Sequence, residues 1–145
     1  MSDPSPAYDR RYLGGILFFN ARDFFEAHEV WESLWLHGCG PERRFVQGLI
    51  QAAVALYHFG NGNVRGAYKL YHSSRKYMEA YGPHYLGLDN ADFWRRMERC
   101  FAELLAQPDP ERHLRPSDEL IPTITLDPPP ESWPDPAEFA DAEDD

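Results

Sequence analysis

The sequence predicts an all-α protein, a compact bundle of about five helices with a proline-rich acidic C-terminal tail. Apolar residues recur at helical spacing in five successive segments between residues 9 and 107. Glycine, proline and asparagine separate these segments, and no alternating pattern is long enough to indicate a sheet. Nine of the 13 prolines lie among acidic residues in 108–145, a composition typical of a linker or tail. We therefore expect a helical domain over residues 8–107 and a tail over residues 108–145.

The net charge of −10 belongs to the expected tail. Residues 108–145 hold twelve acidic and two basic side chains, whereas residues 1–107 hold twelve of each sign. The acidity therefore says little about what the helical domain binds. Because phosphate contacts need an excess of Lys and Arg, we expect no nucleic-acid partner.

Two features predict a cytoplasmic protein without a membrane partner. No stretch approaches the roughly 20 apolar residues that span a bilayer, and the apolar run 13–19 is too short for a signal peptide. Cys39 and Cys100 do not form a CxxC pair, so a reduced setting without a disulfide framework is the simpler interpretation.

The first two expected helices cover residues 9–20 and 23–37. The Gly14-Gly15 pair weakens the first helix, because glycine has a low helix propensity. Asp23 is a good N-cap for the second helix, and Glu26 follows three residues later in a capping-box pattern. We expect both helices to pack against the rest of the bundle through their aromatic residues.

The third expected helix, residues 41–59, is apolar around most of its circumference, which predicts a central position in the bundle. Its Gly48 and Ala52, four residues apart, would let a neighbouring helix approach closely. A fifth helix over residues 89–107 has an apolar stripe at helical spacing and packs on the same core.

The fourth expected helix, residues 63–81, begins at the N-cap Asn63 and has one basic face. We interpret this face as a solvated surface, with a phosphate site or a contact to the acidic tail as alternatives. Its members are Arg65, Lys69, His72, Arg75 and Lys76.

Polar residues interrupt the apolar surfaces of the second and third helices. His28 and Glu32 are one turn apart, so their side chains can meet. On the third helix, all polar side chains between positions 44 and 58 fall in one stripe about 60° wide. If that helix is central, the stripe must face something polar, and we expect it to face His28 and Glu32. The stripe consists of Arg44, Gln47, Gln51 and His58.

Such a constellation of imidazoles, carboxylates and amides would form either a hydrogen-bonded network or a site for a divalent metal. Histidine nitrogen and glutamate oxygen suit Zn, Mn or Fe, and helical bundles carry such sites on facing helices. The candidate metal ligands are His28, Glu32 and His58, the candidate catalytic carboxylates are Glu29 and Glu32, and the candidate ligand-binding residues are Arg44, Gln47 and Gln51.

Plainer interpretations of the same residues remain open. The string His28-Glu29-x-x-Glu32 lacks the second histidine of the zinc-protease motif, so it is not diagnostic alone. The stripe of the third helix fits equally a solvent-facing surface or a buried structural network. The sequence contains no Gly-x-Ser-x-Gly, P-loop or dinucleotide-binding motif.

Several motifs, in order, resemble a bacterial family. They are Phe19-Asn20, Phe25-Glu26-Ala27-His28-Glu29-Val30-Trp31-Glu32 with Trp35, Gln47-Gly48-Leu49-Ile50-Gln51-Ala52-Ala53-Val54-Ala55 with His58, Gly62-Asn63 with Gly66-Ala67, and Tyr85-x-Gly87-Leu88-Asp89. Over about residues 9 to 100 they resemble the family catalogued as domain of unknown function 309. The resemblance implies an all-helical fold and no particular activity. Its pattern includes positions matching Glu26, His28, Glu29, Glu32, Gln47, Gln51 and His58.

Two functional hypotheses follow. The first is a cytosolic helical domain whose polar pocket binds a divalent metal or a small polar ligand, with metal-assisted hydrolysis as the reaction class to test first. The alternative is a non-enzymatic interaction or oligomerisation module that binds a protein partner or its own copy and has a purely structural polar network. The sequence leaves open whether the protein is an enzyme, and identifies neither the substrate nor the oligomeric state.

Overall fold

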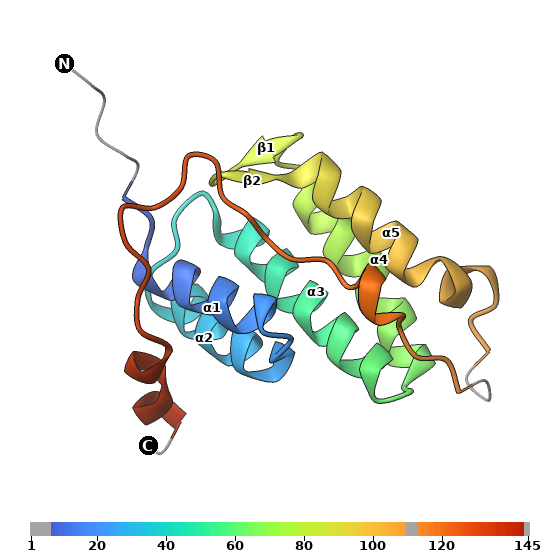
Figure 1. Ribbon diagram of the computed structural model, residues 1–145. Coiled ribbons are helices and arrows are strands. Elements are labelled where there is room, and N and C mark those ends of the chain that lie inside the picture. Colours follow the sequence, from blue (N-terminus) through green and yellow to red (C-terminus); the bar gives the residue numbers. More distant parts are fainter. Residues whose placement is uncertain (1–6, 110–112, 144–145) are drawn as a thin grey trace.

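The computed structural model describes residues 7–109 and 113–143 and confirms the all-α prediction (Figure 1). The elements, in chain order, are α1 (Arg10–Asn20), α2 (Phe24–His37), α3 (Arg43–Gly60), α4 (Val64–Glu79), β1 (His84–Tyr85), β2 (Leu88–Asp89), α5 (Asn90–Ala106) and the 3₁₀ helices η1 (Asp118–Leu120) and η2 (Pro136–Glu143). The five α-helices lie within two residues of their predicted bounds at each end. Within the described ranges, none of these helices has the length and hydrophobicity that crossing a bilayer requires.

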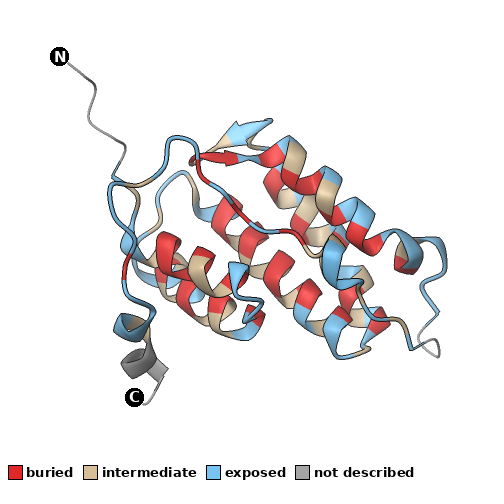
Figure 2. Cartoon of the chain, in the orientation of Figure 1, coloured by how far each residue is buried: buried red, intermediate tan, exposed pale blue. Residues whose placement is uncertain are grey.

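The central helix is α3, which packs against α2 on one side and α4 on the other (Figure 1). Its apolar residues are buried, and Figure 2 shows buried positions along its whole length. A methyl group placed on Gly48 would overlap Met78 and lie 3.1 Å from the carbonyl oxygen of Ser74, both on α4. The predicted central position of this helix and its close approach to a neighbour at Gly48 are therefore confirmed.

The packing of α2 against α1 depends on Gly15, one of the two glycines whose low helix propensity was expected to weaken α1. The indole of Trp31 is fully buried against α1, and its Nε1 donates to the carbonyl oxygen of Tyr12 at 3.1 Å. A methyl group on Gly15 would overlap this indole. The missing side chain at Gly15 thus allows Trp31 to fix α2 against α1.

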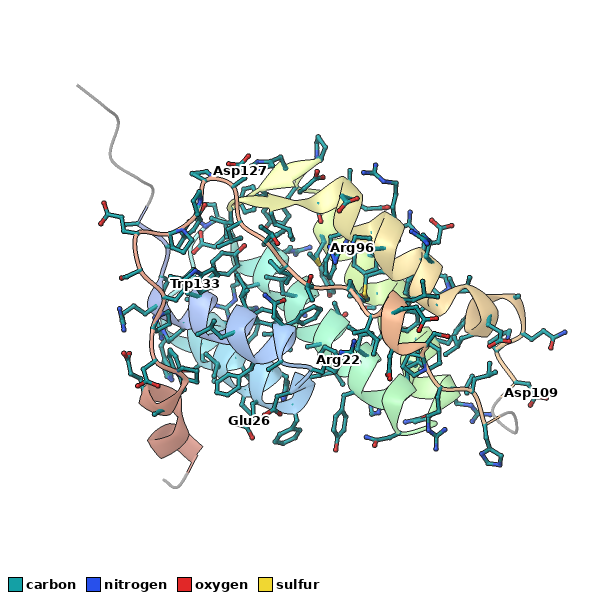
Figure 3. All side chains as sticks on the ribbon, in the orientation of Figure 1. Arg22, Glu26, Arg96, Asp109, Asp127 and Trp133 are labelled. Atoms are coloured by element: carbon teal, nitrogen blue, oxygen red, sulfur yellow. The ribbon has the colours of Figure 1, made fainter. Side chains whose placement is uncertain are left out.

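Side-chain caps begin three of the five α-helices. Asp9 accepts from the backbone N–H of Arg11, Asn63 from that of Gly66, and Asp89 from that of Asp92. Asp23 occupies the N-cap of α2 but makes no side-chain cap hydrogen bond, so the predicted capping box is not formed through its carboxylate. Glu26 lies at the outer edge of α2 (Figure 3).

A short antiparallel hairpin of β1 and β2 connects α4 to α5. Leu86 and Gly87 form its loop with φ values of 47° and 76°. Positive φ at both positions is the backbone of the two-residue hairpin turn that matches the twist of the strands. Sequence reasoning missed this hairpin because each strand has only two residues.

The C-terminal segment runs back across the helices, from η1 beside α5 to η2 beside α1 (Figure 1). Asn20 holds its middle through two hydrogen bonds, since Oδ1 accepts from Ile124 N at 2.7 Å and Nδ2 donates to Ile124 O at 2.9 Å. Ile124 and Leu126 are buried, and Leu126 forms a β-bridge with Leu88. Residues 121–126 therefore lie extended against the helices.

Three arginines anchor the described part of this segment. Arg22 and Arg96 each donate at 2.8 Å to backbone carbonyls of the segment, and Figure 3 labels both side chains. Arg10 forms an ion pair with Glu138 at 2.6 Å. These arginines lie on α1, in the α1–α2 turn and on α5, not on the basic face of α4.

Candidate metal site

The outer side of α2 carries a histidine between two carboxylates. Nδ1 of His28 lies 3.2 Å from Oε1 of Glu29, and Nε2 lies 3.2 Å from Oε2 of Glu32. The side chains are 22%, 40% and 48% exposed respectively, so the imidazole is largely covered while both carboxylates reach solvent. We name these three residues the α2 cluster.

The position of the α2 cluster follows from the amphipathic pattern of the helix. Phe24, Ala27, Val30, Trp31 and Leu34 are buried, which turns the opposite arc outward. His28 lies at the edge of the buried face and Glu32 lies one turn further on. The cluster is therefore accessible from outside without any rearrangement of the core.

Aromatic residues cover one side of the imidazole. The ring of His28 lies 5.5 Å from that of Phe25, and the ring of Phe25 lies 5.8 Å from that of Tyr57 on α3. Phe25 and Tyr57 are nevertheless 48% and 41% exposed. Phe25 lies one helical turn before His28, whereas the contact with Tyr57 joins two helices and so leaves no periodic signal in the sequence.

The α2 cluster has the geometry of a cation site. One ligand atom from each of the three residues lies within 4.8 Å of the other two, and this is the one such group of His, Cys, Asp and Glu in the described ranges. Because an imidazole binds one ion through a single ring nitrogen and the two carboxylates lie at different nitrogens, a shared ion would take one nitrogen and draw the other carboxylate toward it. The same arrangement also suits an imidazolium that donates to both carboxylates.

A hollow of about 480 Å³ adjoins the α2 cluster. Glu29 and Glu32 line it together with Ser33, Arg11 of α1 and Phe139 of η2. Arg11 also donates to the carbonyl oxygen of Ser33 at 3.3 Å, which fixes its guanidinium at the rim. Space for a small polar molecule therefore exists beside the two carboxylates. The sequence did not indicate Arg11 or Phe139, because the first is remote from α2 in the chain and the second lies in the acidic tail.

The polar stripe of α3 faces α4 rather than α2, which corrects the direction expected from sequence. Oε1 of Gln51 accepts a hydrogen bond from Oγ of Ser73 on α4 at 2.5 Å. Arg44 lines a hollow shared with α4, and Gln47 is partly buried. The reason is that α3 packs against both α2 and α4, and the periodicity of one helix does not say which of the two its polar stripe contacts.

His58 also lies outside the α2 cluster. Its Nδ1 accepts from Nδ2 of Asn63, the N-cap residue of α4, at 3.2 Å. The structure therefore brings together His28, Glu29 and Glu32 but not His58, and the expected pocket between His28 and His58 is not formed. His58 and Asn63 are only five residues apart, on either side of the α3–α4 turn. This short spacing was the signal in the sequence for their contact.

Gln51 and Ser73 give a direct test of the corrected direction. Gln51→Ala should lower the free energy of unfolding by about 1 kcal/mol, because it leaves a partly buried serine hydroxyl without its acceptor. Urea denaturation of Gln51→Ala, Ser73→Ala and the double variant measures the coupling. The double variant should cost less than the two single losses combined, whereas strictly additive losses would show that the two side chains do not interact.

Neither cysteine is suited to act as a nucleophile. Burial raises the pKa of the Cys100 thiol to about 12. Burial, and then the charge of Glu42, raise the pKa of the Cys39 thiol. Both groups therefore stay protonated at neutral pH, where a nucleophile needs the thiolate.

The fold and the α2 cluster together define a small all-helical protein with a His–Glu–Glu group on its second helix. Residues 12–70 match the family model described as "Domain of unknown function (DUF309)", which confirms the resemblance indicated by the motifs. The matched residues include the whole of α2, whereas the Tyr85–Asp89 motif lies outside them.

The chain is also similar to the uncharacterized protein YpuF of Bacillus subtilis (strain 168). The two are 34% identical over 101 residues, which cover 67% of this chain and 58% of YpuF. The chain thus spans less than two thirds of the length of the curated relative it matches. Neither the family description nor the name of the relative states an activity.

Proposed function

We propose that the α2 cluster binds a divalent metal ion through His28, Glu29 and Glu32. The observation that carries the proposal is that one ligand atom from each of the three residues lies within 4.8 Å of the other two. One nitrogen and two oxygen ligands suit Zn, Mn or Fe better than Mg or Ca, which prefer oxygen alone. Glu29 takes the ligand position that the sequence assigned to His58.

Metal-assisted hydrolysis is the reaction class that we propose to test first. Three protein ligands leave a coordination position for water, which is typical of catalytic rather than structural sites. A bound metal would lower the pKa of such a water and so supply a nucleophile. The hollow beside Glu29 and Glu32 offers a place for a small polar substrate. Glu29 or Glu32 would act as the base through the carboxylate oxygen that does not hold the metal, by accepting a proton from that water.

Metal content and metal titration test this proposal. Protein purified without chelator or affinity histidines should contain close to one equivalent of Zn, Mn or Fe by elemental analysis, or take up one equivalent in a calorimetric titration. His28→Ala should abolish this uptake. His84→Ala is the control, because His84 is exposed and lies outside both the cluster and the hollow beside it.

The outcome also separates the two functional hypotheses. Equal uptake by wild type and His28→Ala would contradict the proposed site. An absence of uptake, with His28→Ala and Glu32→Ala folded and stable, would favour the interaction module, in which the three side chains form a purely structural polar network. Circular dichroism of each variant establishes that the comparison is made between folded proteins.

We also infer that the protein works in the cytosol. Both cysteines are free in the structure, and Cys100 is buried in the core. Free thiols are usual where glutathione and thioredoxin keep proteins reduced.

A further inference from the structure

A second polar hollow lies between α3 and α4, on residues that the α2 cluster does not use. Its volume is about 770 Å³, within the range of roughly 300–1,000 Å³ that is usual for small-molecule sites. Arg44 of α3 and His72, Ser73, Lys76 and Tyr77 of α4 line it, with Tyr81 beyond the end of α4. We name it the α3–α4 hollow.

The lining of the α3–α4 hollow is cationic. Arg44 and Lys76 reach it from two different helices, and no Asp or Glu is among its lining residues. Neither cation forms an ion pair or hydrogen bond with any described residue, although the chain carries 24 acidic side chains. By contrast, Arg75 on the same helix pairs with Glu79 at 2.7 Å. Two unpaired positive charges that converge on one hollow attract an anion there more strongly than isolated surface charges do.

The imidazole of His72 is held at the edge of this hollow. Its ring packs edge-on against Tyr68, with centroids 4.6 Å apart, and against Tyr71, with centroids 5.2 Å apart. It can donate a hydrogen bond through a ring nitrogen to an anion between Arg44 and Lys76.

Two of the three hydroxyl groups that line the hollow donate their protons to other parts of the protein. Ser73 donates to Gln51 at 2.5 Å, and Tyr81 donates to the carbonyl oxygen of Pro41 at 2.8 Å. Their oxygens therefore offer lone pairs that accept from a hydroxyl or amino group of a ligand. The hollow thus combines donors for an anionic group with acceptors for a neutral one.

We propose that the α3–α4 hollow binds a small organic phosphate ester. A phosphate dianion matches two cations and an imidazole better than a singly charged carboxylate does. A small molecule fits the limited volume, whereas a nucleic acid would need basic residues spread along a longer surface. Two residues of the polar stripe of α3 then contribute to binding. Gln51 orients the Ser73 hydroxyl through their hydrogen bond, and the Arg44 guanidinium contacts the phosphate.

Phenyl phosphate is a suitable probe, since it joins a phosphate to a ring of the size of a tyrosine side chain. Titration by ¹⁵N NMR, with EDTA present to keep the α2 cluster free of metal, should give saturable shifts at residues of α4 around positions 72–77. Arg44→Gln and Lys76→Gln should each weaken binding by about tenfold or more, because each removes one charge–charge contact. Inorganic phosphate should compete, and benzoate should bind more weakly.

Arg65→Gln and Lys69→Gln are the matched controls, because both residues lie on the basic face of α4 but outside the hollow. They should leave the affinity within about twofold of wild type. Equal losses in these controls would show diffuse attraction to the basic face and overturn the proposal. So would binding of benzoate as tight as that of phenyl phosphate, or an absence of saturable shifts at millimolar probe.

Discussion

Gly15→Ala should destabilise the protein, although alanine is favoured over glycine in a helix by about 1 kcal/mol. The new methyl group would overlap the indole of Trp31, which is fully buried and bonded to the carbonyl oxygen of Tyr12. Either the rigid indole or α1 must shift, and such overpacking costs about 1–3 kcal/mol. After the propensity gain of about 1 kcal/mol is subtracted, we expect a net loss of up to about 2 kcal/mol in the free energy of unfolding, measured from the urea midpoint.

Gly60→Ala is the matched control, because it is the same substitution in the last turn of α3. Apart from the adjoining backbone of α3 itself, nothing lies within 4 Å of a methyl group built there. The free energy of unfolding should therefore stay constant or rise by up to about 1 kcal/mol. Stabilisation by both substitutions would contradict the role given to Trp31 in fixing α2.

Glu32→Gln should abolish most of the metal affinity of the α2 cluster while leaving the fold intact. The amide keeps the size of the side chain but loses the charge that a divalent ion requires. Changes to groups that merely support a ligand already cost about 10–100-fold in affinity, so loss of the ligand itself should cost roughly 100-fold or more. Calorimetric titration with Zn²⁺ and Mn²⁺ measures the difference.

Stability supplies the control for this prediction. Glu32 is half-exposed, so its exchange for Gln should change the free energy of unfolding by no more than about 0.5 kcal/mol. Glu103→Gln on α5 removes one exposed carboxylate far from α2 in sequence and should leave metal affinity unchanged. An equal loss of affinity in both variants would indicate general attraction by the acidic protein rather than a site.

Local patterns predicted the helices well because they are properties of single segments. The cap at Asn63 and the close approach at Gly48 each follow from residues a few positions apart, whereas the cap expected at Asp23 makes no side-chain hydrogen bond. The proximity of His28 and Glu32 belongs to the same class, since both lie on one helix.

Contacts between segments were harder to predict. α3 packs between α2 and α4. Its helical periodicity therefore identified the residues of the polar stripe but not the helix that they face. The two adjacent serines on α4, Ser73 and Ser74, were the available signal that Gln51 would find a partner there. The contact of Phe139 with the hollow beside Glu29 joins positions more than a hundred residues apart, and composition alone gave no sign of it.

Paramagnetic relaxation by Mn²⁺ tests the central claim most directly, because it locates the ion as well as detecting it. At substoichiometric Mn²⁺, amide signals of residues 25–33 on α2 should broaden first in ¹⁵N NMR spectra, and His28→Ala should remove this selectivity. The acidic residues of η1 and η2 provide the competing site within the same molecule. Broadening that begins in residues 118–120 or 136–143, with α2 unaffected, would show that His28, Glu29 and Glu32 do not form a metal site.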